Sequence, residues 1–141
     1  MLSKKILKKI PIVKRVYPSL MKMFYKNKKI KFKFFGLNLE GNFSEPMDKE
    51  IFLFNNYENL QIEFLINNIK KYNLKYFIDI GANSGIYSLI IRDKFHKIRI
   101  KSFEPVKKTI DKFKDNLKFN KKLKNIKLYE FGLSNKNTKL L

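Results

Sequence analysis

Cysteine is absent from this chain of 141 residues, histidine and alanine occur once each, and acidic residues number only 12. Without cysteine the chain can form neither a disulfide scaffold nor a cysteine-ligated metal site, and we expect no metal centre. Against the 12 acids stand 32 basic residues, which gives a net charge of +20. Such a charge is typical of proteins that bind nucleic acid or anionic membranes. However, Lys, Ile, Asn, Phe and Tyr make up more than half of the chain, a skew that A/T-rich codons produce without any polyanionic partner.

Long hydrophobic runs are also absent. The longest uninterrupted apolar stretches are a few residues, such as 51–54, whereas a membrane-spanning helix needs about 20. The basic N-terminus has no continuous apolar region and no small-residue cleavage site, so it does not resemble a secretory signal. We therefore expect a cytoplasmic protein.

The basic residues are concentrated at the two ends of the chain. Residues 1–39 carry 12 basic residues and no acid, whereas residues 40–89 carry four basic and seven acidic residues. Within residues 1–29 apolar residues recur at spacings of three and four, which predicts a basic amphipathic helical extension; these residues are Leu2, Ile6, Ile10, Val13, Tyr17, Leu20 and Phe24.

Pro11 and Pro18 interrupt this pattern, which favours two short helices or a kinked helix over a single rod. An extension of this kind can rest on an anionic membrane surface or a partner. It can equally pack on the domain that follows it, and the sequence leaves both interpretations open.

Residues 30–56 show a different period. Ile30, Phe32 and Phe34 alternate with lysines, and Gly36 and Gly41-Asn42 supply turn signals, which predicts a β-hairpin or meander. Helical spacing returns from residue 57, with Asn55 or Asn56 as a candidate N-cap. We expect residues 57–141 to form one α/β domain.

The most informative stretch begins with an apolar run at residues 76–80, followed by a small-residue loop at 81–85 and then renewed helical spacing. The run predicts a strand buried on both faces in a parallel sheet. A strand that leads through a glycine-bearing loop into a helix places backbone N–H groups and a helix N-terminus beside a ligand.

Several interpretations compete for this loop. A dinucleotide site requires G-x-G-x-x-G, but Asn83 and Ile86 stand where the second and third glycines belong. A phosphate-binding P-loop requires a longer loop that ends in Lys-Ser or Lys-Thr, which is absent. An S-adenosylmethionine loop has an acidic residue two positions before the first glycine, and Asp79 stands there. A tight turn without any ligand would leave the carboxylate at the end of a buried strand unexplained.

A second strand is predicted at residues 98–103, and Glu104-Pro105 ends it. Glu104 lies 23 residues after Gly81. In a βαβ unit this spacing places a carboxylate at the carboxyl end of the neighbouring strand, where it can accept hydrogen bonds from ribose hydroxyls. A helix follows, and a third strand is predicted at residues 126–131.

These strings of residues resemble the successive motifs of FkbM-family methyltransferases, which are class I S-adenosylmethionine-dependent enzymes and commonly methylate hydroxyl groups. The resemblance extends from about residue 47 to the end of the chain and rests on FIDIGANSG at 77–85, SFEP at 102–105, NLKFN at 116–120 and NIKLYEFGLSN at 125–135.

The resemblance implies a role for six residues. The methionine part of the cofactor would be held by Asp79, Gly81, Asn83 and Gly85, its ribose by Glu104, and Gly132 would lie near the adenine. It also implies a Rossmann-like sheet of seven strands, of which only the first three are predicted here. We therefore expect the cofactor-binding half of a truncated enzyme, with little or no turnover.

No residue can be assigned as catalytic from the sequence. His96, the single histidine, falls in a loop at the end of the sheet opposite the ligand, where we expect it to be solvated. The expected acceptor is a small-molecule or saccharide hydroxyl, and no specific nucleic-acid partner is expected. The alternative function is a non-enzymatic basic module that binds nucleic acid or anionic membrane.

Overall fold

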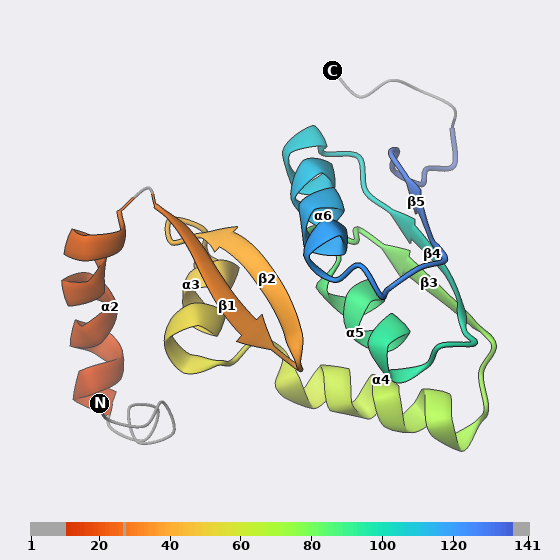
Figure 1. Ribbon diagram of the computed structural model, residues 1–141, viewed down its shortest axis with the longest axis horizontal. Helices are drawn as coiled ribbons and strands as arrows, with labels where there is room; N and C mark the ends of the chain where they lie inside the picture. Colours follow the sequence, from red (N-terminus) through yellow and green to blue (C-terminus); the bar gives the residue numbers. More distant parts are fainter. Residues whose placement is uncertain (1–10, 27, 137–141) are drawn as a thin grey trace. The chain divides into compact units, whose positions relative to one another are not determined.

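The computed structural model describes residues 11–26 and 28–136. The chain divides into two compact units, residues 1–63 and 64–141, and Figure 1 labels the elements of each. Their order along the chain is α2 Pro11–Tyr25, β1 Lys29–Phe34, β2 Leu37–Asn42, α3 Pro46–Phe54, α4 Asn59–Lys71, β3 Tyr76–Ile80, α5 Ile86–Lys94, β4 Arg99–Phe103, α6 Lys107–Phe119 and β5 Ile126–Tyr129. The boundary between the units falls within α4.

Helix α2 runs from Pro11 to Tyr25 with Pro18 inside it. Pro18 therefore does not end the helix, whereas the part of the expected pattern that precedes Pro11 lies outside the described residues. Aromatic contacts on both sides of Pro18 hold the helix against its own unit, since Tyr17 packs edge-on against Phe54 and Tyr25 packs against Phe43. The stripe residues Leu2, Ile6 and Ile10 lie outside the described part of the chain.

The predicted hairpin is confirmed. Strands β1 and β2 pair antiparallel, with Phe34 opposite Leu37. The two turn residues, Phe35 and Gly36, both have positive φ, as a two-residue turn between twisted strands requires. The alternation is as expected, because Ile30, Phe32 and Phe34 are buried and the lysines between them are exposed.

Gly41 is not a turn residue, because it lies within β2. A Cβ atom at Gly41 would lie 2.3 Å from Cγ of Asp48, so only glycine fits there. Asp48 is completely buried, and its Oδ2 accepts a hydrogen bond from the Asn42 amide at 2.8 Å. This glycine therefore makes room for a carboxylate that holds the end of the hairpin.

The segment 30–56, expected as a hairpin or meander, also contains a helix, α3. The local signals for it are Pro46 at the first helical position and Asp48 in the first turn. Asn55, a candidate N-cap for the next helix, is instead the C-cap of α3 and has the left-handed conformation. Its backbone N–H donates a hydrogen bond to Ile51 O at 2.7 Å. The helix predicted from residue 57 is confirmed as α4.

The second unit contains three parallel strands in the order β3-β4-β5. They lie close to the predicted positions, and α5 and α6 are the helices that connect them. Two consecutive βαβ crossovers of this kind are typical of the first part of a Rossmann-like sheet.

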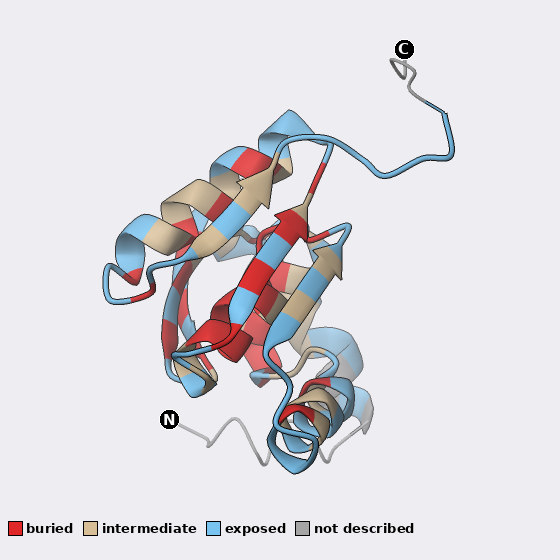
Figure 2. Cartoon of the chain, turned by 90° about the vertical axis from the view of Figure 1, so that its right-hand side faces the viewer, coloured by how far each residue is buried: buried red, intermediate tan, exposed pale blue. Residues whose placement is uncertain are grey.

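The two faces of this sheet differ. One face packs on α4 and α5 through a core that includes Ile69, Ile91 and Ile100. Figure 2 shows the opposite face in front of the helices. There Ile78 and Ile80 of β3 are 58% and 67% exposed, so the expectation that β3 is buried on both faces is wrong. Strand β3 is an edge strand in the order β3-β4-β5, and the side chains of Ile78 and Ile80 lie on the face that the core with Ile69 and Ile91 does not cover.

Candidate functional site

The loop after β3 has an unusual backbone. Gly81, Asn83 and Gly85 have φ values of 73°, 50° and 80°, so every second residue of the loop is left-handed. Glycine adopts this conformation without strain, and asparagine is one of the few other residues that tolerate it. Nothing lies within 4 Å of the position a Cβ would take at Gly81, so this glycine leaves open space at the end of β3.

Strand β4 holds the loop from one side. The amides of Gly81 and Ala82 both donate to Phe103 O, at 2.9 and 3.0 Å. Glu104 is 5% exposed, and its Oε2 accepts a hydrogen bond from the Asn83 amide at 2.7 Å. Its Oε1 accepts one from the Val106 amide at 2.9 Å. The carboxylate that was predicted to bind a ribose therefore also fastens the loop to the end of β4.

Helix α6 supports the loop from another side. Asn116, which is buried, donates from Nδ2 to Ser84 O at 3.1 Å. A Cβ at Gly85 would lie 2.3 Å from the ring of Phe113. Gly85 is therefore required by the packing of α6, which explains it without any ligand. Asn116 belongs to a motif noted in the sequence, but its role depends on a contact 32 residues away along the chain.

A chain of polar side chains lies behind the loop. Ser88 Oγ donates to Asp79 Oδ2 at 2.6 Å and lies 2.7 Å from Ser102 Oγ. Burial raises the pKa of Asp79 above its ordinary value, and the hydrogen bond from Ser88 opposes this effect. Sequence reasoning missed Ser88 and Ser102. The available signal was that each is a small polar residue on the apolar face of its element.

Two polar features mark the start of α5. The N-cap residue is Gly85, which has no side chain to cap the helix, and the first N–H groups of a helix have no partner within it. Ser84 Oγ is buried and has no hydrogen-bond partner. Among residues 11–26 and 28–136 it is the only buried side-chain nitrogen or oxygen that lacks a partner. A buried oxygen normally has a hydrogen-bond partner, so the loop contains one buried polar atom that its own contacts do not satisfy.

The remaining predicted residues lie as follows. Gly132 follows β5, and a Cβ there would lie 3.6 Å from Cγ of Pro105, so Gly132 is close to the Glu104 end of β4. His96 is exposed in the turn that precedes β4, whereas the loop follows the carboxyl ends of the strands. No cluster of three or more metal-ligating side chains occurs in the part of the chain that the structure describes.

The parallel sheet, its crossovers and the loop at the carboxyl end of β3 define the beginning of a Rossmann-like α/β fold. The chain is similar to the crystal structure of a SAM-dependent methyltransferase from Agrobacterium tumefaciens, with a TM-score of 0.55 and 14% identity. The match covers 72% of this chain and 32% of that one. This likeness shows that the α/β unit has the fold of part of such an enzyme.

A curated relative points to the same class. Methyltransferase sdnD of Sordaria araneosa is 36% identical to this chain over 59 residues, which are 42% of this chain and 23% of the relative. No protein-family profile matches the sequence. The chain therefore matches less than a third of the length of either methyltransferase.

Proposed function

We propose that this chain is the cofactor-binding part of an S-adenosylmethionine-dependent methyltransferase. The observation that carries the proposal is the pair of carboxylates, Asp79 and Glu104, at the carboxyl ends of adjacent parallel strands and next to the loop. Both similarities reported above are to methyltransferases. Membership of the FkbM family, supported by the motifs at 77–85 and 102–105, is part of the same proposal.

The residues of the loop fit the cofactor chemically. The carboxylate of Asp79 offers a negative charge to the ammonium group of the methionine part. Glu104 uses one lone pair on each oxygen for a backbone amide, and a carboxylate has about four such sites. About two therefore remain for ribose hydroxyls. The first turn of α5, where the N-cap residue Gly85 has no side chain, supplies further backbone N–H groups.

Bound S-adenosylmethionine supplies an electrophilic methyl group on a sulfonium, and an in-line nucleophile accepts it. The contribution of this chain is to bind and orient the cofactor, and orientation alone can account for much of the rate in such a transfer. We propose a small-molecule or saccharide hydroxyl as the acceptor. No described residue is placed to act as a general base, so we propose that the chain by itself has little or no turnover.

The alternative, a basic module that binds nucleic acid, has less support. Lysines of α6 pair with neighbouring acids, since Lys107 contacts Asp111 and Lys118 contacts Asp115. Lys114 also pairs with Glu130 across to the segment after β5. Ion pairs of this kind reduce the positive potential that a polyanion would meet on this helix.

Titration of the full chain with S-adenosylhomocysteine, followed by calorimetry and by amide chemical shifts, tests the proposal. We expect binding in the micromolar to millimolar range and shifts confined to residues near 79–86, 104 and 132. Asp79→Asn should abolish the shifts, whereas Asp111→Asn, which removes the same charge from the exposed face of α6, should not. A lack of shifts at millimolar ligand in a folded sample would contradict the proposal.

A further inference from the structure

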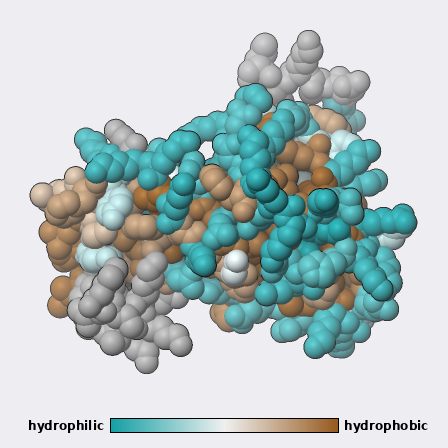
Figure 3. Space-filling model, in the orientation of Figure 1, coloured by the Kyte–Doolittle hydropathy of each residue, from teal (hydrophilic) through white to brown (hydrophobic). Residues whose placement is uncertain are grey.

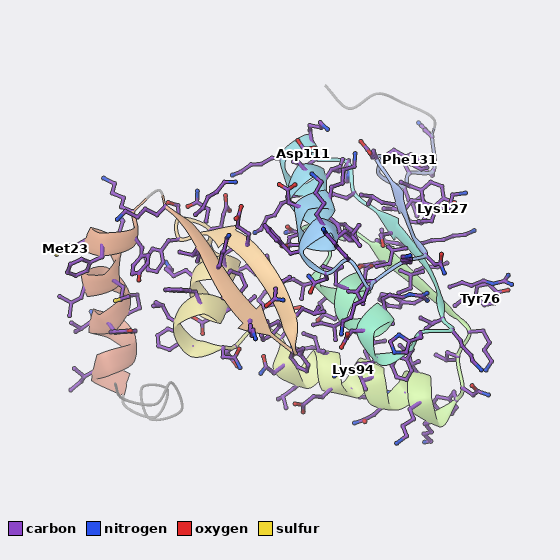
Figure 4. All side chains as sticks on the ribbon, viewed as in Figure 1. Met23, Tyr76, Lys94, Asp111, Lys127 and Phe131 are labelled. Carbon is purple, nitrogen blue, oxygen red and sulfur yellow. The ribbon has the colours of Figure 1, made fainter. Side chains whose placement is uncertain are left out.

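Helix α2 has two apolar sides, and only one of them is covered by its own unit. Tyr17 and Tyr25 lie on the covered side, against Phe54 and Phe43. The other side carries large apolar residues that are between 47% and 78% exposed and recur at helical spacing; this open stripe of α2 consists of Ile12, Val16, Leu20, Met23 and Phe24. Figure 4 shows Met23 on the side of α2 that points away from β1.

Positive charges border the open stripe. Arg15, Lys22 and Lys26 are exposed. Lys26 directly follows α2, and its amide continues the helical hydrogen bonding to Lys22 O at 2.9 Å. The spacing of seven and four residues therefore places the three cations along one line, next to the stripe. No acidic residue occurs anywhere in residues 1–39. Figure 3 shows the apolar side chains gathered on the outer surface of α2. The surface of α2 thus combines an exposed apolar stripe with cations and without any opposing charge.

We propose that α2 binds the surface of an anionic lipid bilayer, with the open stripe of α2 in the interfacial region and the cations at the headgroups. A helix with an apolar face and a flanking row of Lys and Arg lies in the plane of a membrane, and its affinity depends on anionic lipid. The 15 residues of α2 are too few to cross a bilayer. No helix among the described residues is both long and apolar enough to span a membrane.

The net charge of the chain argues against binding of a second copy of the chain to the open stripe of α2. A second copy would bring another net charge of +20 and a second row of cations to the same surface, and like charges brought together oppose association. The anionic bilayer supplies both the apolar interior and the opposite charge. This proposal does not depend on the proposed methyltransferase activity, and neither result affects the other.

Sedimentation of the full chain with vesicles tests the proposal. We expect binding to vesicles of phosphatidylcholine mixed with phosphatidylglycerol, little binding to phosphatidylcholine alone, and a decrease with added salt. The double variant Leu20→Gln/Met23→Gln keeps the charge and should reduce partitioning by about tenfold. The matched control Ile78→Gln/Ile80→Gln, on the open face of the sheet, removes two apolar residues of similar exposure and should leave partitioning unchanged.

Two further variants distinguish the effect of the cations beside the stripe on vesicle binding from the effect of the net charge of the chain. Arg15→Gln/Lys22→Gln/Lys26→Gln removes the cations beside the stripe, and Arg99→Gln/Lys101→Gln/Lys127→Gln removes the same number from the second unit, where all three are exposed. We expect the first set to weaken binding by about tenfold or more and the second by far less. Equal losses in the two sets would show non-specific attraction and overturn the proposal.

The absence of cysteine allows a direct measurement that does not rely on loss of binding. A polarity-sensitive dye attached to Met23→Cys should shift to shorter emission wavelengths on addition of the anionic vesicles, whereas the same dye at Asp111→Cys should not. An unchanged spectrum for the Met23→Cys probe while the protein sediments with the vesicles would overturn the proposal. So would a shift that follows protein concentration without lipid, because that would identify a second copy as the occupant.

Discussion

Glu104, at the carboxyl end of β4, accepts a hydrogen bond of 2.7 Å from the backbone amide of Asn83, 21 residues earlier in the chain. Its other carboxylate oxygen accepts the amide of Val106. A single buried side chain therefore joins the loop after β3 to the segment that begins α6. The same residue holds the loop in shape, and we propose that its remaining lone pairs accept hydrogen bonds from a ligand.

Glu104→Gln should lower the free energy of unfolding by about 1–3 kcal/mol, because the amide group of Gln can accept only one of the two backbone N–H groups and leaves the other without a partner. Urea denaturation measures this change. Glu130→Gln removes an exposed ion pair with Lys114 and should change the stability by less than about 0.5 kcal/mol. Equal effects of the two substitutions would show that Glu104 does not fasten the loop.

Asp79→Asn should separate stability from ligand binding. Asn retains an oxygen for the hydrogen bonds that the hydroxyl and the backbone N–H of Ser88 donate to Asp79, and it removes a carboxylate whose ionisation burial disfavours. The melting temperature of the free protein should therefore stay constant or rise, while binding of S-adenosylhomocysteine is lost. Thermal unfolding and calorimetry on the same samples give both values. A lower melting temperature would show that the ionised carboxylate stabilises the fold.

The pH dependence of stability follows from the raised pKa of Asp79. Between the ordinary pKa of 3.8 and the raised value, the folded protein binds more protons at this site than the unfolded chain does. The contribution of Asp79 to stability is therefore greatest below pH 3.8 and is lost as the pH rises through the raised pKa. Urea denaturation of the wild type and of Asp79→Asn across this range should show the wild type losing stability relative to the variant.

The pH dependence of ligand binding has the opposite sign. The ammonium group of the ligand is attracted only to the ionised carboxylate, so affinity should rise with pH through the raised pKa and then level off. Calorimetry at several pH values measures this dependence, and the Asp79→Asn variant should show none. An affinity that falls over this range would contradict the assignment of Asp79 to the ammonium group.

Substitution by alanine should lower the stability of the fold less at Gly81 than at Gly85. Gly81→Ala meets open space, so only the left-handed backbone opposes it, at about 1–2 kcal/mol. Gly85→Ala has the same backbone cost and also collides with the buried ring of Phe113, which adds about 1–3 kcal/mol. Chemical denaturation should rank the two variants in this order. Adding Phe113→Leu to Gly85→Ala should recover part of the loss if the collision with the ring is its cause.

Much of the second unit could be predicted from the sequence because its signals are local. The apolar run at 76–80, the glycine-bearing loop and the spacing to Glu104 are all contained in consecutive residues. Together with the run at 126–131, they predicted three parallel strands and two carboxylates at adjacent strand ends. Helix α3 was missed because apolar residues fill most of its second half, at 51–54, and such a run has no distinct period of 2 or 3.6.

Other properties depend on residues that are far apart in the chain. The sequence alone determined where Asp79, Gly81, Gly85 and Glu104 stand relative to the strands. Only the tertiary structure decided that Gly85 is needed for Phe113 of α6, that Glu104 binds the amide of Asn83, and that one face of β3 stays uncovered. Periodicity and turn chemistry record the conformation of neighbouring residues. Contacts across more than 20 residues are set by how the elements pack, which no local pattern specifies.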